Sequence, residues 1–171
     1  MEQLHLVIQH ALGWTNSHLH EFETKKGERI GRPHADDENF GREVIDERRV
    51  TVAEMFPKPK VRLAYIYDMG DYWVHAVTFE KMIPPPALPA LSRSKGTPAA
   101  IYMAGERACP PEDCGGFPGY ERILELKSGG KPEHEDERER MDWLGDWRPE
   151  VAVPSGAQRM LSKIRVKGAR K

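Results

Sequence analysis

The stretch VRLAYIYDMGDYWVHAVTF, residues 61–79, decides the fold class of this chain. Apolar residues alternate with others in residues 61–67, and the same period of two returns in residues 72–82, as expected for half-buried strands. Between the two runs lies Asp68-Met69-Gly70-Asp71, a turn in which Gly70 can adopt a positive φ. The stretch therefore predicts a β-hairpin. On the first strand one face would carry Val61, Leu63, Tyr65 and Tyr67, and on the return strand one face would carry Trp73, His75, Val77 and Phe79.

A second strand pair is predicted upstream. From His18 to Glu23 the side chains again alternate, which places His18, His20 and Phe22 on one face. A turn at residues 25–28 leads to a short return strand at residues 29–31. Residues 33–48 are polar and lack periodicity, so we expect a surface loop there.

Helices are expected around this sheet. Apolar residues recur at helical spacing in residues 1–12, and Gly13 is positioned to end that helix. Thr51 and Glu54 have capping-box spacing for a short helix. Residues 120–127 and 132–144 predict two more helices. We therefore expect a single compact α+β domain in residues 1–150, a small, mainly antiparallel sheet covered by helices, followed by a basic tail in residues 151–171.

The composition of the chain limits which classes of function are expected. The chain has 171 residues, 39% of them hydrophobic, and a net charge of −1, so its overall charge gives no reason to expect nucleic-acid or membrane binding. It contains no apolar run long enough to predict a transmembrane helix, and its start does not resemble a signal peptide. Two cysteines do not make a disulfide scaffold. A reduced, cytoplasmic setting is expected.

The stretch ACPPEDCGG, residues 108–116, holds both cysteines of the chain. Two prolines stiffen its start, two carboxylates occupy its middle, and two glycines follow the second cysteine. We expect this stretch to lie close to the turn of residues 68–75, because the polar groups of both would otherwise lack partners.

One interpretation of these residues is a metal site. Zinc accepts thiolate, imidazole and carboxylate ligands, and His18 and His20 would point to the same side of a strand. The four-residue gap between the cysteines is close to zinc-finger spacing, although no second Cys pair or HxxxH motif completes the pattern. The candidate ligands are His18, His20, His75, Cys109 and Cys114, and oxygen donors could come from Asp68, Asp71, Glu112 and Asp113.

The alternative interpretation is structural. His75 shares an apolar stripe with Trp73, which is typical of a half-buried histidine. Asp68 and Asp71 flank a tight turn, where aspartates bond their own backbone. Cys109 and Cys114 could be small buried hydrophobic residues. A Cys–His nucleophile is a third possibility, but no nucleophile motif surrounds either cysteine.

The end of the chain is basic. Its cations could bind a phosphate backbone in a salt-dependent manner. Alternatively, Met160, Leu161 and Ile164 could form a short amphipathic helix that packs on the domain. The basic residues are Arg159, Lys163, Arg165, Lys167, Arg170 and Lys171.

Three motifs carry a family resemblance: HLHEF (residues 18–22), YDMGDYWVH (residues 67–75) and ERACPPEDCGG (residues 106–116). Together with GY at residues 119–120 and WLGD at residues 143–146, they resemble the plasmid pRiA open-reading-frame-three-like family, the TnpR-like proteins of insertion sequences and plasmids. The resemblance implies a compact α+β fold. It implies no established reaction.

The sequence departs from that family pattern at its start. Family members usually carry a strand segment similar to IRPPIWRR before the first helix, whereas this chain begins almost at the helix. A missing strand would expose a sheet edge and favour pairing with another chain, hence an oligomer. Met69 replaces the phenylalanine of the usual YDFGD element, which is expected to alter packing only.

Two functions follow as hypotheses. The first is a non-catalytic binding or interaction module, an accessory protein of plasmid or mobile-element type. The second is a zinc-dependent enzyme, or a metal-stabilised nucleic-acid-binding protein, that uses the histidine, cysteine and aspartate residues of the three motifs.

Overall fold

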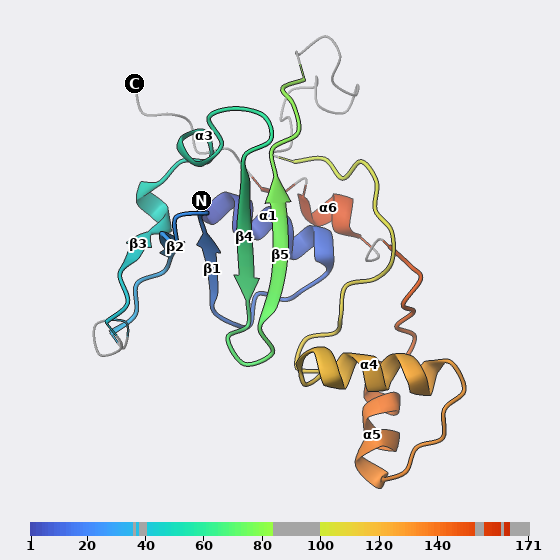
Figure 1. Cartoon of the computed structure of the whole chain (residues 1–171). Helices are drawn as coiled ribbons and strands as arrows, with labels where there is room; N and C mark the ends of the chain where they lie inside the picture. The colour runs from blue at the N-terminus through green and yellow to red at the C-terminus, as the bar shows by residue number, and fades with distance from the viewer. Residues whose placement is uncertain (36, 38–40, 84–99, 153–155, 162, 165–171) are drawn as a thin grey trace.

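A five-stranded open sheet forms the centre of the protein (Figure 1). The computed structural model describes residues 1–35, 37, 41–83, 100–152, 156–161 and 163–164. The sheet has the order β3-β2-β1-β4-β5, and only its β2–β3 pair is parallel. This confirms the predicted α+β class. The strands are β1 (His20–Glu23), β2 (Arg29–Gly31), β3 (Val44–Asp46), β4 (Arg62–Tyr67) and β5 (Trp73–Thr78).

The β4–β5 hairpin has the predicted register. Tyr65 lies opposite His75, and Tyr67 lies opposite Trp73, so the apolar stripe falls on one face. The turn differs from the prediction in one respect. Its left-handed residues are Asp68 (φ 59°) and Tyr72 (φ 56°) rather than Gly70.

Helix α1 (Glu2–Leu12) lies across one face of the sheet, with the short helix α6 (Ala157–Leu161) beside it (Figure 1). Gly13 ends α1 with a φ of 83°, as predicted. Leu161 and Ile164 are buried as the amphipathic pattern predicted, together with Ala157, whereas Met160 is 39% exposed. The basic residues from Arg165 to Lys171 lie outside the described part of the chain.

Two further helices lie at one end of the sheet, α4 (Gly116–Lys127) and α5 (Glu135–Leu144) (Figure 1). Helix α4 begins within the cysteine stretch, earlier than the predicted start at Tyr120. Helix α3 (Val52–Met55) has the predicted capping box between Thr51 and Glu54. Among the described residues, no helix is both long enough and apolar enough to span a membrane.

The prediction of a loop over residues 33–48 was wrong. This segment contains the edge strand β3, followed by the 3-10 helix η1 (Glu47–Arg49). Strand β3 has three residues and is half-exposed, so it lacks the alternation that identifies a strand, and parallel pairing with β2 defines it instead. Among the described residues of this segment, Glu47 is the buried one, with 1% exposure.

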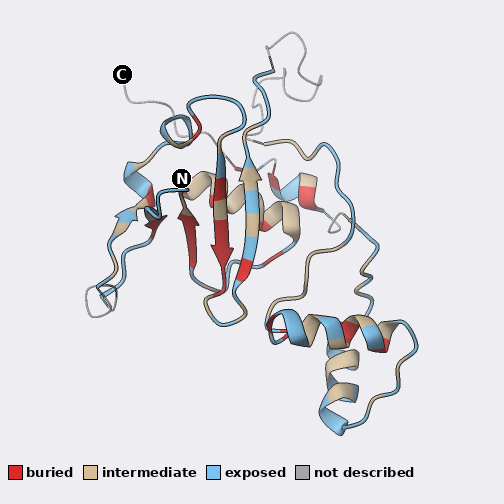
Figure 2. Ribbon diagram, viewed as in Figure 1, coloured by how far each residue is buried: buried red, intermediate tan, exposed pale blue. Residues whose placement is uncertain are grey.

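The central strands β1 and β4 are largely buried (Figure 2). The core around them is rich in aromatic residues and extends to the cysteine stretch and α4. Trp14 stacks on Tyr67 with ring centroids 4.5 Å apart. This contact places the end of α1 and the end of β4 together, so the loops that follow them meet at the same edge of the domain. The core includes Trp14, Phe22, Ile30, Leu63, Tyr65, Tyr67, Trp73, Cys114 and Ile123.

Candidate metal site

His18, Asp68 and Asp113 come together from the three motifs. His18 Nε2 lies 3.1 Å from Asp113 Oδ1 and 3.7 Å from Asp68 Oδ2. The three donor atoms all lie within 4.8 Å of one another. In the part of the chain that the structure describes, this is the one group of three histidine, cysteine or carboxylate residues with that proximity.

Tyr67 and Glu112 hold the segments in this arrangement. The Tyr67 hydroxyl donates a hydrogen bond to Glu112 Oε1 and accepts hydrogen bonds from the backbone N–H groups of Ser17 (3.0 Å) and His18 (3.3 Å). Glu112 Oε2 accepts from the backbone N–H and the hydroxyl of Thr15, at 2.9 and 2.6 Å. One tyrosine and one glutamate therefore connect the loop before β1, the end of β4 and the cysteine stretch.

These contacts determine the charge of Glu112. Burial raises the pKa of Glu112, but the hydrogen bonds from Thr15 and Tyr67 outweigh it and hold that pKa below its ordinary value. Burial, together with the hydrogen bond to Glu112, raises the pKa of Tyr67. Glu112 is therefore a carboxylate and Tyr67 a neutral phenol at neutral pH.

One carboxylate oxygen of Asp68 is hydrogen-bonded within its own turn. Its Oδ1 accepts hydrogen bonds from the N–H groups of Gly70 (2.9 Å) and Asp71 (3.2 Å), as the structural interpretation predicted. Its Oδ2 is the oxygen that lies near His18. Both Asp68 and Asp113 are left-handed, with φ of 59° and 57°, a conformation that aspartate tolerates better than most L-residues.

His18 Nε2 is buried and has no hydrogen-bond partner. It is close to Asp113 Oδ1, but the two atoms are not aligned for a hydrogen bond. A buried polar atom in this state needs a physical reason, and a metal ion would supply one. Two donors bound to one ion at about 2.1 Å lie roughly 3.0–3.4 Å apart. The 3.1 Å between His18 Nε2 and Asp113 Oδ1 falls in this range, whereas the 3.7 Å to Asp68 Oδ2 exceeds it, so Asp68 would have to move closer to share the ion.

His20 takes part in a separate buried network. Its Nε2 lies 2.9 Å from Glu47 Oε2, and its ring stacks on His5 with centroids 3.4 Å apart. The roles of His5 and Glu47 were not predicted from the sequence. His5 lies on the apolar side of a helix, and Glu47 lies in a segment expected to be exposed, so neither position carried a signal.

His75 and Cys109 contact each other, with Nε2 and Sγ 3.9 Å apart. Burial raises the pKa of Cys109 to about 12 and lowers that of His75, so the pair does not generate a thiolate at neutral pH. Cys114 is fully buried, and its S–H group points to the Gly116 carbonyl. Both cysteines are free thiols.

The cysteine stretch packs against the 68–75 turn, which confirms the predicted proximity. Asp71 Oδ2 accepts a hydrogen bond from the Gly115 N–H at 3.2 Å. Gly116 has a φ of 65°, and a Cβ there would lie 3.1 Å from the Asp71 carbonyl oxygen. Trp73 is buried and packs edge-on against Tyr120. The three motifs thus form one continuous corner of the fold.

Residues 1–154 match the family model described as plasmid pRiA4b ORF-3-like protein. The chain belongs to this family. The chain is also similar to the uncharacterised protein y4hQ of Sinorhizobium fredii (strain NBRC 101917 / NGR234). The two are 33% identical over 174 residues, which cover 100% of this chain and 82% of that protein.

A solved structure has the same fold. The crystal structure of a protein of unknown function, MM3350 from Methanosarcina mazei Go1, is similar with a TM-score of 0.65 and 34% sequence identity. The match covers 89% of this chain and 79% of that one. The similarity therefore supports the pRiA4b ORF-3-like fold through most of the described chain, while neither relative's description states an activity.

Proposed function

We propose that this pRiA4b ORF-3-like protein binds a divalent metal ion, zinc or manganese, through His18, Asp68 and Asp113, and uses it in a hydrolytic reaction. The observation that carries the proposal is the approach of three ligand atoms from three motifs, one of them a buried imidazole nitrogen without a hydrogen bond. Imidazole suits zinc, and carboxylates suit manganese.

The donor set supports an open rather than a closed site. Structural zinc sites have four protein ligands, whereas catalytic sites have three and leave a position for water or substrate. The Asp113 side chain is 68% exposed, so solvent and a substrate could reach the ion, while Asp68 would anchor it from the buried side. When bound, such an ion polarises a substrate oxygen or lowers the pKa of a bound water.

The other residues of the corner would position these ligands. Glu112 fixes the backbone next to Asp113, and Tyr67 fixes the backbone of His18. Outer contacts of this kind orient metal ligands. The proposal keeps His18 from the predicted ligand set and replaces His20, His75, Cys109 and Cys114 with the oxygen donors Asp68 and Asp113.

The role as an accessory or interaction module remains a second hypothesis. Strand β5 has no strand partner on its outer edge among the described residues, and Val74 on it is 56% exposed. An unblocked edge favours pairing with another chain. Three further properties remain predictions: nucleic-acid binding by the basic tail, a cytoplasmic location, and a plasmid or mobile-element role.

The test is isothermal titration of the tag-free protein with Zn²⁺ and with Mn²⁺. We expect one site per chain, lost in His18→Gln and Asp68→Asn and weakened in Asp113→Asn. Asp142→Asn changes an exposed carboxylate on α5 and serves as the control. Absence of binding, or binding that depends on Cys109→Ser but not on His18→Gln, would overturn the proposal.

A further inference from the structure

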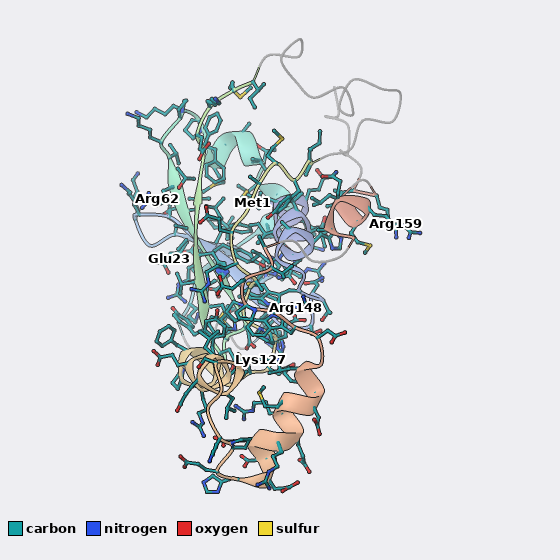
Figure 3. All side chains as sticks on the ribbon, turned by 90° about the vertical axis from the view of Figure 1, so that its right-hand side faces the viewer. Met1, Glu23, Arg62, Lys127, Arg148 and Arg159 are labelled. Carbon is teal, nitrogen blue, oxygen red and sulfur yellow. The ribbon has the colours of Figure 1, made fainter. Side chains whose placement is uncertain are left out.

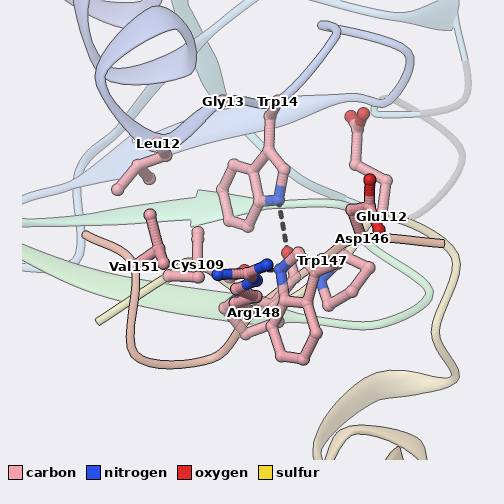
Figure 4. A pocket seen from close by; sticks show the side chains of 12 residues that line it. Leu12, Gly13, Trp14, Cys109, Glu112, Asp146, Trp147, Arg148 and Val151 are labelled. Carbon is pink, nitrogen blue, oxygen red and sulfur yellow. Dashed lines mark hydrogen bonds between the residues drawn. The ribbon is translucent and has the colours of Figure 1, made fainter. Parts of the chain in front are cut away.

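A separate cleft lies beside the cysteine stretch (Figure 4). Its volume is about 480 Å³, within the range of small-molecule pockets. Figure 3 places Arg148 between the sheet layer and helices α4 and α5. The residues that matter for its chemistry are Trp14, Pro110, Glu112, Asp146, Trp147 and Arg148.

Two indole rings in the cleft are fixed before any ligand binds. The Trp14 N–H donates to the Pro110 carbonyl at 2.8 Å, and the Trp147 N–H donates to the Cys109 carbonyl at 3.3 Å (the first bond is visible in Figure 4). Trp14 is only 5% exposed and stacks on Tyr67, so it forms an inner wall of the cleft. Trp147 is half-buried and its N–H is already used, so it can offer a ligand only its apolar and π surface. Fixed rings also reduce the entropy lost on binding.

Two opposite charges border the cleft without pairing. The side chains of Asp146 and Arg148 make no hydrogen bond or ion pair with each other or with any other residue that the structure describes. Glu112 differs, because both of its oxygens are already hydrogen-bonded. The cleft thus retains one available carboxylate and one available guanidinium.

We infer that this cleft binds a zwitterionic ligand with a flat apolar body, namely a free aromatic α-amino acid. The Arg148 guanidinium would bind the ligand carboxylate through paired hydrogen bonds, and Asp146 would bind the ammonium group. The aromatic side chain would pack against the Trp147 indole. This site is distinct from the proposed metal site and does not depend on it.

The test is calorimetric titration of the full chain in the presence of EDTA. The ligands are L-phenylalanine, phenethylamine, which lacks the carboxylate, and 3-phenylpropionate, which lacks the ammonium group. We expect saturable binding of phenylalanine and affinities for the two analogues that are each lower by about tenfold, because each loses one charge-assisted contact.

Two variants assign the charges. Arg148→Gln should lower the affinity for phenylalanine about tenfold and leave that for phenethylamine unchanged. Asp146→Asn should lower the affinity for phenylalanine and leave that for 3-phenylpropionate unchanged. Both residues are exposed, so the fold should be retained. Arg49→Gln and Asp142→Asn, also at exposed positions, are the matched controls.

Three results would overturn the inference: no saturable binding of phenylalanine, equal affinity for phenylalanine and phenethylamine, or an Arg148→Gln effect that is the same for both. The His18→Gln variant separates the two proposals, because it should abolish metal binding and leave phenylalanine binding intact.

Discussion

The Tyr67 hydroxyl donates a hydrogen bond to Glu112, a residue 45 positions further along the chain. The same oxygen accepts the backbone N–H of His18. The position of a proposed metal ligand is therefore determined by a contact between the end of β4 and the cysteine stretch. Several consequences of this arrangement can be measured.

Replacing Tyr67 with Phe should destabilise the protein and weaken metal binding. The change leaves Glu112 Oε1 and two backbone N–H groups without their partner, at a cost of about 1–3 kcal/mol in the free energy of unfolding. Metal affinity should fall by roughly 10–100-fold. Urea unfolding and calorimetry measure the two effects. Tyr72→Phe, at an exposed residue, is the control, and equal behaviour of the two variants would contradict the account.

Replacing Gly116 with Ala should cost more stability than replacing Gly41. Both glycines are left-handed, with φ of 65° and 62°, but a Cβ at Gly116 meets the Asp71 carbonyl at 3.1 Å, whereas a Cβ at Gly41 meets nothing within 4 Å. Backbone strain of about 1 kcal/mol is common to both. The difference between their unfolding free energies therefore measures the contact between the cysteine stretch and the β4–β5 turn. No difference would mean that this contact is loose in solution.

The His5 network predicts a loss of stability in mild acid. Gln9 donates to the Tyr65 hydroxyl, so that hydroxyl donates to His5 Nδ1, and His5 Nε2–H donates to Asn16. This arrangement requires neutral His5. Burial and the nearby His20 lower the pKa of His5 from 6.5 to about 4.

Because the unfolded chain binds this proton first, the stabilisation is complete above pH 6.5. It is lost progressively as the pH falls toward 4, by roughly 3 kcal/mol in total. His5→Gln should flatten the dependence of unfolding free energy on pH between 6.5 and 4, and His10→Gln should not. An unchanged slope in His5→Gln would contradict the lowered pKa, because it would mean that His5 binds its proton equally well in the native and unfolded protein.

Both cysteines should react slowly in the native protein. Burial raises the pKa of Cys109 to about 12 and that of Cys114 to about 11, and only the thiolate reacts with iodoacetamide. Mass spectrometry should find little alkylation at pH 8 in native protein and complete alkylation in urea. Rapid labelling of Cys109 would instead indicate an activated thiol and would support the Cys–His nucleophile.

The sequence predicted the parts of the fold that depend on local patterns. Alternation identified the β4–β5 face, and the Thr51–Glu54 spacing identified a cap. It did not predict β3, because a parallel edge strand of three residues has no pattern of its own. The position of Glu47, buried beneath a polar segment, depends on that strand.

The site was predictable in its residue types but not in its grouping. His18, Asp68 and Asp113 were all named as candidate donors, together with residues that the structure places in other contacts. Spacing could not separate them, because the grouping depends on left-handed turns at Asp68 and Asp113 and on the long-range contact of Glu112 with Tyr67 and Thr15. These contacts are set by the tertiary fold.

The most direct test of the proposed metal site is anomalous scattering at the zinc edge from crystals grown with Zn²⁺. The account predicts one peak per chain, at about 2.0–2.2 Å from His18 Nε2 and from the Asp68 and Asp113 carboxylates. A peak at Cys109 or Cys114 instead, or no peak at His18 in crystals whose zinc concentration exceeds that of the protein, would contradict it.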